Sequence, residues 1–243
     1  MQYWGITDQG CVRPQNQDAW KIEELDRNSI LCVVCDGMGG AKSGNVASNL
    51  AVEVFVQQIR DSWKSNMTQE EVDGLLCNTV KLVNFTVHDQ SMQVEDFAGM
   101  GTTLVAALIQ GRKMTVVNVG DSRCYHLRQN SIRCVTVDHS VVQMMVQRGE
   151  LTPEQAKKYP GKNLITRAVG PMSTVQCDLF HADVERGEGI LLFSDGLTNM
   201  MDDQEILFEF AHGSDRQNCC QQLLEVAKNR GAPDNVTCIL VQI

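Results

Sequence analysis

The feature that most restricts the fold of this 243-residue chain is a series of short, β-branched runs, with short connections between those in the middle of the sequence. Strands joined in this way pair antiparallel, because a parallel crossover needs a dozen or more residues. The chain is therefore expected to form antiparallel sheets rather than a repeated βαβ unit. The predicted strands are residues 3–8, 30–35, 102–109, 113–119, 132–137, 175–180, 189–194 and 236–242.

Helical periodicity occupies the segments between these runs. Two helix starts are marked in the sequence: Thr68 and Glu71 have the spacing of a capping box, and Thr152 precedes Pro153 as an N-cap before an N1 proline. The sequence predicts an α+β fold class with sheets and helices stacked in layers. The predicted helices are residues 44–62, 69–92, 140–149, 203–212 and 215–229.

Length, composition and charge limit the class of protein. A chain of 243 residues with 43% hydrophobic side chains can bury the core of one domain, and no linker or repeat divides it. The net charge of −9 and pI near 5.0 argue against a nucleic-acid binder, which needs a basic face. The sequence has no charged leader and no apolar run near the roughly 18 residues of a membrane helix. We expect a single domain over 1–243, cytoplasmic and without membrane insertion.

Ten cysteines would indicate a disulfide framework only in a short, exported chain. Cys32 and Cys35 form a CxxC pair, which elsewhere can bind zinc or act in redox chemistry. Residues three apart in a strand point to opposite faces, however, and no second CxxC completes a zinc site. Most of the cysteines are expected to be small core residues.

Four aspartates stand at the ends of predicted strands or in adjoining loops. Asp36 and Asp195 each end an apolar run before a glycine, Asp18 follows the first strand, and Asp234 precedes the last. Asp-Gly alone more often marks a turn. A rigid scaffold can nevertheless bring four strand ends to one point, where the carboxylates repel one another and their pKa values rise. A cation would remove that conflict.

Oxygen is the ligand type that these segments supply, with no histidine or cysteine placed among them. Such a set favours Mg²⁺ or Mn²⁺ over Zn²⁺, and Gly37 has no side chain to obstruct its carbonyl. Two ions about 4 Å apart would hold a bridging water, lower its pKa and orient it for in-line attack on phosphorus. Asp36 would then be the ligand that both ions share.

Eight short motifs occur in a fixed order along nearly the whole chain: RxxNxD at 13–18, DGMGG at 36–40, GTT at 101–103, GDSR at 120–123, DHS at 138–140, TRAVG at 166–170, SDG at 194–196 and DN at 234–235. Each motif alone is weak, but the ordered set is specific. It resembles the metal-dependent Ser/Thr protein phosphatases of type 2C, the PPM family, in its compact bacterial form.

The resemblance implies a four-layer α/β/β/α sandwich, in which two antiparallel sheets are flanked by helices on both outer faces. It implies an enzyme that hydrolyses phosphoserine and phosphothreonine in proteins and opposes a Ser/Thr kinase, which could itself be a substrate. We expect it to act as a monomer. The segment at about 140–170 would form a flap beside the cleft.

The resemblance also assigns site residues. The ligands of two Mn²⁺ or Mg²⁺ ions would be Asp18, Asp36, the Gly37 carbonyl, Asp195 and Asp234. Asp121 would belong to a third, weaker metal site, and Arg13 would bind the substrate phosphate through its planar, charged fork. Without the motif, Arg13 would be interpreted as an ordinary surface or salt-bridging arginine.

Two positions depart from the family pattern. Gln17 stands where many relatives have glutamate, and Met38 stands where animal relatives carry a histidine proposed to protonate the leaving group. Methionine cannot donate a proton. His139 or a metal-bound water is left as the donor, and His139 fits a capping or core role equally well.

Two other functions stay open on the sequence. The GDS at 120–122, with Asp178 and His181, imitates the Ser…Asp-x-x-His order of a serine hydrolase but leaves the four strand-end aspartates unexplained. A phosphatase-like regulatory or binding module without turnover has no need of all four acids. A P-loop is excluded, because GMGGAKSG lacks the Gly-Lys-Ser/Thr step.

Overall fold

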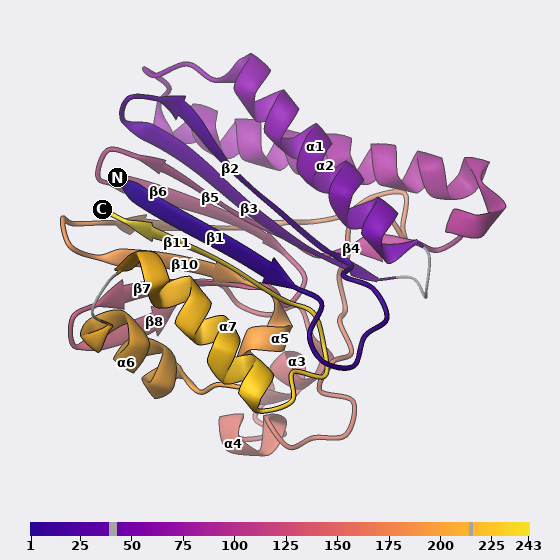
Figure 1. Cartoon of the computed structure of the whole chain (residues 1–243). Helices are drawn as coiled ribbons and strands as arrows, with labels where there is room; N and C mark the ends of the chain where they lie inside the picture. Colours follow the sequence, from indigo (N-terminus) through magenta and orange to yellow (C-terminus); the bar gives the residue numbers. More distant parts are fainter. Residues whose placement is uncertain (39–42, 214–215) are drawn as a thin grey trace.

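The computed structural model describes residues 1–38, 43–213 and 216–243 (Figure 1). The glycines that end the DGMGG motif, Gly39 and Gly40, lie outside these described residues. The strands are Gln2–Asp8 (β1), Asp18–Asp26 (β2), Ser29–Met38 (β3), Gly101–Thr102 (β4), Leu104–Gln110 (β5), Lys113–Val119 (β6), Arg123–Arg128 (β7), Ser131–Cys134 (β8), Asp178–Asp183 (β9), Gly189–Phe193 (β10) and Val236–Gln242 (β11). The α-helices are Gly44–Ser62 (α1), Gln69–Gln93 (α2), Val141–Gln147 (α3), Pro153–Ala156 (α4), Asp195–Thr198 (α5), Asp203–His212 (α6) and Cys219–Asn229 (α7).

The strands form two antiparallel sheets. One has the order β1-β11-β10-β7-β8, and the other has the order β2-β3-β5-β6-β9, with the short β4 paired to β3. Helices α1 and α2 cover the outer face of the β3 sheet, and α6 and α7 lie against the outer face of the β11 sheet (Figure 1). Both chain ends lie in one sheet, because β1 pairs with β11.

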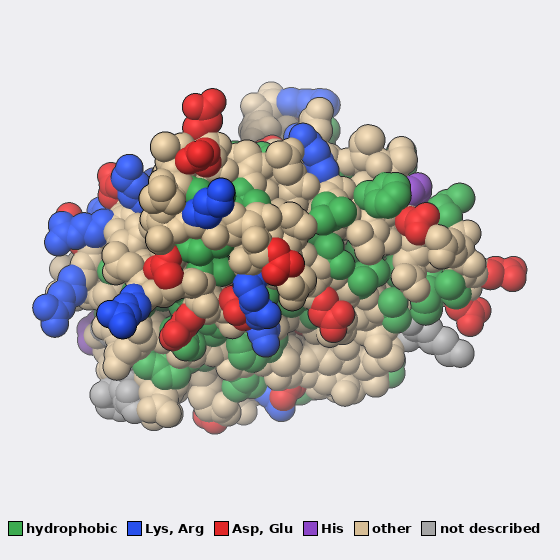
Figure 2. All heavy atoms as spheres, turned by 90° about the horizontal axis from the view of Figure 1, so that it is seen from above, with side chains coloured by type: hydrophobic (Ala, Val, Ile, Leu, Met, Phe, Trp, Pro, Cys, Tyr) green, Lys and Arg blue, Asp and Glu red, His purple; other side chains and the backbone are tan. Residues whose placement is uncertain are grey.

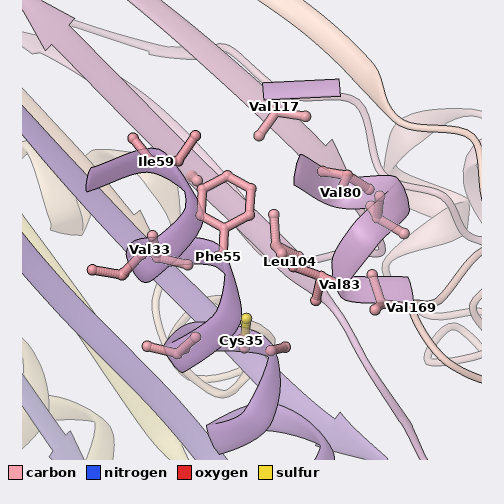
Figure 3. Close-up of a cluster of buried hydrophobic side chains, with 14 of the residues drawn as sticks. Val33, Cys35, Phe55, Ile59, Val80, Val83, Leu104, Val117 and Val169 are labelled. Atoms are coloured by element: carbon pink, nitrogen blue, oxygen red, sulfur yellow. The ribbon is translucent and has the colours of Figure 1, made fainter. Parts of the chain in front are cut away.

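Three clusters of buried apolar side chains separate the four layers. The first, around Phe55 of α1 and Leu104 of β5, packs α1 and α2 onto their sheet (Figure 3). The second packs α6 and α7 onto the other sheet, and the third fills the space between the sheets. Cys35 belongs to the first cluster and Cys32 to the third, so the CxxC side chains diverge as predicted. All ten cysteines are free thiols. The predicted α/β/β/α sandwich is confirmed.

Local sequence explains where several helices begin. Thr68 forms the predicted capping box at the start of α2, and Thr152 is the predicted N-cap of α4, where Gln155 completes a capping box as well. Strands β2 and β7 were not predicted, because the sequences DAWKIEELD and RCYHLR place charged residues among the apolar ones. The predicted helix at 215–229 begins as α7 at Cys219, after a 3₁₀ turn over Arg216–Asn218.

The outward face of the α1–α2 layer has a mixed character. Acidic and basic side chains are interspersed there with apolar ones (Figure 2). Phe85 and Met92 of α2 are among the exposed apolar residues. In the described part of the chain, no helix has the length and apolar character needed to cross a membrane.

Candidate active site

The apolar core between the sheets ends in a layer of polar side chains. In β3, Ile30, Cys32 and Val34 alternate onto the inter-sheet face, and Asp36 is the next residue in that alternation. Asp18 is the direct partner of Asp36 in the β2–β3 ladder. Directly opposed residues of two antiparallel strands project from the same face of the sheet. The pairing register therefore brings these two carboxylates together.

The facing sheet contributes hydroxyl groups to this layer. Thr237 continues the inward alternation of Ile239 in β11, and Ser194 follows the last residue of β10. The backbone N–H of Ser194 donates to the Thr237 carbonyl oxygen at 3.1 Å, so the two residues lie side by side. Thr7 of β1 pairs with Thr237 from the other side. Three hydroxyls thus form a row across three adjacent strands.

Six of the seven predicted site residues line one cleft of about 450 Å³ at this end of the sandwich. Asp18, the seventh, is not among the lining residues. It is buried next to Asp36, with 7% of its surface exposed. The six lining residues are Arg13, Asp36, Gly37, Asp121, Asp195 and Asp234. The loops that follow β1 and β6 supply Arg13 and Asp121, Asp195 begins α5, and Asp234 precedes β11.

Asp18 has an uneven set of partners. Its Oδ2 lies 2.7 Å from the Ser194 hydroxyl and 2.6 Å from the Thr237 hydroxyl. Its Oδ1 is buried and has no hydrogen-bond partner among the described residues. Burial and the nearby carboxylates of Asp195 and Asp234 raise the pKa of Asp18 to about 7. A buried carboxylate oxygen without a donor costs free energy unless a cation approaches it.

The pKa values of the neighbouring carboxylates are raised as well. Burial raises the pKa of Asp36 well above its usual value, and the charges of Asp18 and Asp195 add to the rise. Burial and Asp195 raise the pKa of Asp121 to about 7, and burial and Asp234 raise the pKa of Asp195. Buried carboxylates that raise one another's pKa do not all stay ionised by themselves, whereas bound divalent cations would favour the ionised form.

The residues fit Mg²⁺ or Mn²⁺ by donor type and charge, since four carboxylates line one cleft and Asp18 beside them has a buried oxygen without a partner among the described residues. Among the described residues, no three His, Cys, Asp or Glu side chains are already drawn together around one point. Two carboxylates besides Asp18 also accept from protein side chains. Arg13 Nη2 donates to Asp234 Oδ2 at 2.6 Å, and Asn199 Nδ2 donates to Asp195 Oδ2 at 3.1 Å.

The loop that carries Arg13 is fastened by Asn235. The Asn235 Nδ2 donates to the carbonyls of Gln9 and Gln15, and its Oδ1 accepts from the backbone N–H of Gln17. The DN motif therefore contributes both a carboxylate at the cleft and the amide that anchors the opposite loop. The side chain of Arg13 itself is half exposed, at 51%.

Two glycines permit close approaches around the cleft. A Cβ on Gly37 would lie 2.1 Å from the Gly44 carbonyl oxygen, so only glycine lets α1 begin against the end of β3. Gly120 has φ of +110° and would clash with Thr103 at 2.6 Å if it had a Cβ. The turn that presents Asp121 depends on this residue.

His139 does not line the cleft. It is buried, and its Nδ1 accepts from the backbone N–H of Gly120 at 3.0 Å. Because a backbone N–H can only donate, the ring proton lies on Nε2, which is 3.1 Å from Asp178 Oδ2. Burial lowers the pKa of His139 despite this carboxylate. Of the two roles left open by the sequence, the geometry favours the core role.

The serine-hydrolase alternative is contradicted by the contacts of its residues. Ser122 is fully buried, and its hydroxyl lies 2.7 Å from that of Thr103. His181 contacts the carboxylate of Asp73 at 2.9 Å, and Asp178 pairs with His139 and Arg167 instead. Ser122, Asp178 and His181 each contact other residues, so they form no triad.

The segment 140–170 lies beside the cleft. It contains α3 and α4, and Lys162 Nζ donates to Asn199 Oδ1 at 2.9 Å. A second cavity, of about 690 Å³, lies between this segment and the residues that follow Asp195. Asp121, Asn163 and Asp195 line both cavities, so the two lie next to each other.

Sequence reasoning missed the role of the hydroxyl residues around the carboxylates. Thr103 Oγ1 accepts from the backbone N–H of Asp36 at 2.9 Å, and Thr237 contacts Asp18. One pattern in the sequence could have indicated this role: Thr103 and Thr237 each continue the alternation of inward-facing apolar residues along a strand. The pairing register was needed to interpret it.

Comparison with known proteins finds one family over most of the chain. Residues 13–225 match the family model described as protein phosphatase 2C. The serine/threonine phosphatase stp of Listeria monocytogenes is 36% identical over 239 residues, covering 97% of this chain and 93% of the relative. Protein phosphatase PhpP of Streptococcus pneumoniae is 33% identical, covering 98% and 96%.

Solved structures show the same fold. The serine/threonine phosphatase Stp1 from Staphylococcus aureus superposes with a TM-score of 0.93 at 34% identity, covering 99% of this chain and 94% of that one. The serine/threonine phosphatase PstP/Ppp of Mycobacterium tuberculosis gives 0.88 at 31% identity, covering 100% and 98%.

Proposed function

Because this chain belongs to the protein phosphatase 2C family and is a metal-dependent protein-serine/threonine phosphatase, we propose that its catalytic centre is the cleft at the end of the inter-sheet core. The whole chain of 243 residues would form one catalytic domain, and the segment 140–170 would be its flap.

One observation carries the assignment of the centre. Carboxylates from both sheets meet at one cleft, and the innermost of them, Asp18, has a buried oxygen that no described residue satisfies. A module that only binds a partner gains nothing from this arrangement, because the buried charges destabilise the fold.

We assign Asp18, Asp36, the Gly37 carbonyl, Asp195 and Asp234 as ligands of two ions, Mg²⁺ or Mn²⁺, and Asp121 as a ligand of a third. Divalent ions bound there would lower the pKa of a coordinated water and offset the charge that develops on the phosphoryl group. Arg13 would hold the substrate phosphate. Its side chain already lies at the cleft beside Asp234, and a planar guanidinium binds two phosphate oxygens at once.

The substrates would be phosphoserine and phosphothreonine proteins, which would bind at the cleft and at the adjacent cavity beside the segment 140–170. We propose that the enzyme removes the phosphates that a cognate Ser/Thr kinase adds. We also propose that it acts as a monomer in the cytoplasm. The acidic balance of the chain, −9, gives no support for nucleic acid as a partner.

The decisive test is dephosphorylation of a phosphothreonine peptide by metal-stripped enzyme with and without added Mn²⁺. We expect turnover with Mn²⁺ and none in excess EDTA, because the protein side chains alone cannot generate the nucleophile. Calcium at the same concentration serves as a control for ionic strength. Full turnover in EDTA after stripping would refute the proposed centre, and no turnover under any condition would favour a binding module.

A further inference from the structure

Two hydroxyl side chains that touch Asp18 have no place in the function proposed above. We propose that Thr237 and Ser194 are positioning residues that hold Asp18 with one carboxylate oxygen reserved for a divalent cation. This inference rests on the proposed function of Asp18 as a metal ligand, and it adds two residues to the support of that ligand.

The hydrogen bonds around Asp18 have a fixed direction. An ionised carboxylate can only accept, so both the Thr237 hydroxyl at 2.6 Å and the Ser194 hydroxyl at 2.7 Å donate to Oδ2. Each hydroxyl has one hydrogen. Neither can therefore donate elsewhere while it serves Asp18.

The hydroxyls are themselves held in place by donors. The backbone N–H of Thr237 donates to Ser194 Oγ at 3.1 Å. Because the Thr237 hydroxyl donates to Asp18, its 2.6 Å contact with Thr7 makes Thr7 the donor, and Asn16 Nδ2 in turn donates to Thr7 Oγ1 at 2.8 Å. The chain of donors thus runs in one direction, from Asn16 to Asp18.

A purely structural network would be expected to satisfy both oxygens of a buried carboxylate. Here Oδ2 has two donors and Oδ1 has none among the described residues, although Ser194 and Thr237 are fully buried beside it. Such an arrangement is costly for folding alone. It is explained if the lone pairs of Oδ1 are kept for a cation and the rotation of the carboxylate is blocked through Oδ2.

The test uses the full chain and measures binding of Mn²⁺ alone, without substrate. The electron paramagnetic resonance signal of free Mn²⁺ gives the dissociation constant, and the melting temperature in EDTA reports the fold separately. Thr237→Val keeps the shape of the side chain but removes the hydroxyl, Ser194→Ala is a second removal, and Thr237→Ser restores the donor. Thr79→Val is the matched control, because Thr79 is a buried threonine in α2 that bonds the Leu75 carbonyl, away from the cleft.

We expect Thr237→Val and Ser194→Ala each to weaken Mn²⁺ binding by about 10- to 100-fold, the usual effect of removing a residue that orients a metal ligand. Thr237→Ser should bind close to wild type, and Thr79→Val should bind like wild type. Unchanged affinity in both removal variants would overturn the inference, as would a Thr237→Ser variant as weak as Thr237→Val. If wild-type protein itself leaves the Mn²⁺ signal unaltered, the proposed metal centre fails, and the inference fails with it.

Discussion

Replacing His139 with alanine separates a structural from a catalytic histidine. The substitution removes the acceptor of the Gly120 N–H and the donor to Asp178, and it leaves the buried Gly120 N–H without a partner. A lost hydrogen bond costs about 1 kcal/mol and an unsatisfied buried donor about 1–3 kcal/mol, so the free energy of unfolding should fall by about 2–4 kcal/mol. For a chain of this size each kcal/mol lowers the melting temperature by about 2–4 °C.

The assay compares two substrates that differ in their need for a proton donor. A phosphothreonine peptide has a poor leaving group that needs protonation, whereas p-nitrophenyl phosphate scarcely does. Because His139 lies outside the cleft with both ring nitrogens engaged, we expect the variant to lose activity on both substrates by the same factor. A general acid would instead give a difference of about 10²–10⁴-fold between them.

His126→Ala is the matched control for loss of a buried histidine. His126 lies on β7, is 3% exposed and is not among the residues that line the cleft. Its Nε2 contacts Glu188 at 2.7 Å. It should lower the melting temperature with little change in kcat/KM. A selective loss on the phosphothreonine peptide in His139→Ala, at an unchanged melting temperature, would refute our placement of His139 and make it the proton donor.

Two further substitutions test the residues of the cleft. Asp36→Asn should lower kcat with saturating Mn²⁺ by a thousandfold or more, which corresponds to a loss on the order of 4 kcal/mol of transition-state stabilisation. Phosphopeptide assays measure this loss, and activity within tenfold of wild type would show that Asp36 is only a turn residue. Arg13→Ala should chiefly raise KM, because the guanidinium binds the phosphate of the ground state as well as that of the transition state. Initial-rate kinetics test this, and a fall confined to kcat would assign Arg13 to the transition state alone.

The sequence predicted the layers of this fold because they depend on local patterns. Apolar, β-branched runs and helix caps are visible in the sequence, and the strand predicted at 30–35, which is part of β3, was found from such a run. Strand β2 was missed, since its outer positions are charged. With it the Asp18–Asp36 register was missed too, because an irregularity between Glu24 and Asp26 shifts the pairing of this β2–β3 hairpin by one residue.

The same limit explains which part of the site escaped prediction. The carboxylates were recognised together, because Asp36 and Asp195 end apolar runs and Asp18 and Asp234 stand next to strands. Ser194 and Thr237 are ordinary residues in strands, and only their pairing across β10 and β11 makes them partners of Asp18 on the facing sheet. Function here depends on where an apolar core stops. The inward alternation continues past the last apolar layer in both sheets: the next residue is Asp36 in β3, and it is a hydroxyl residue, Ser194 or Thr237, on the facing sheet. The hydroxyls satisfy only one oxygen of Asp18, so cations bound at the proposed centre would stabilise the folded chain.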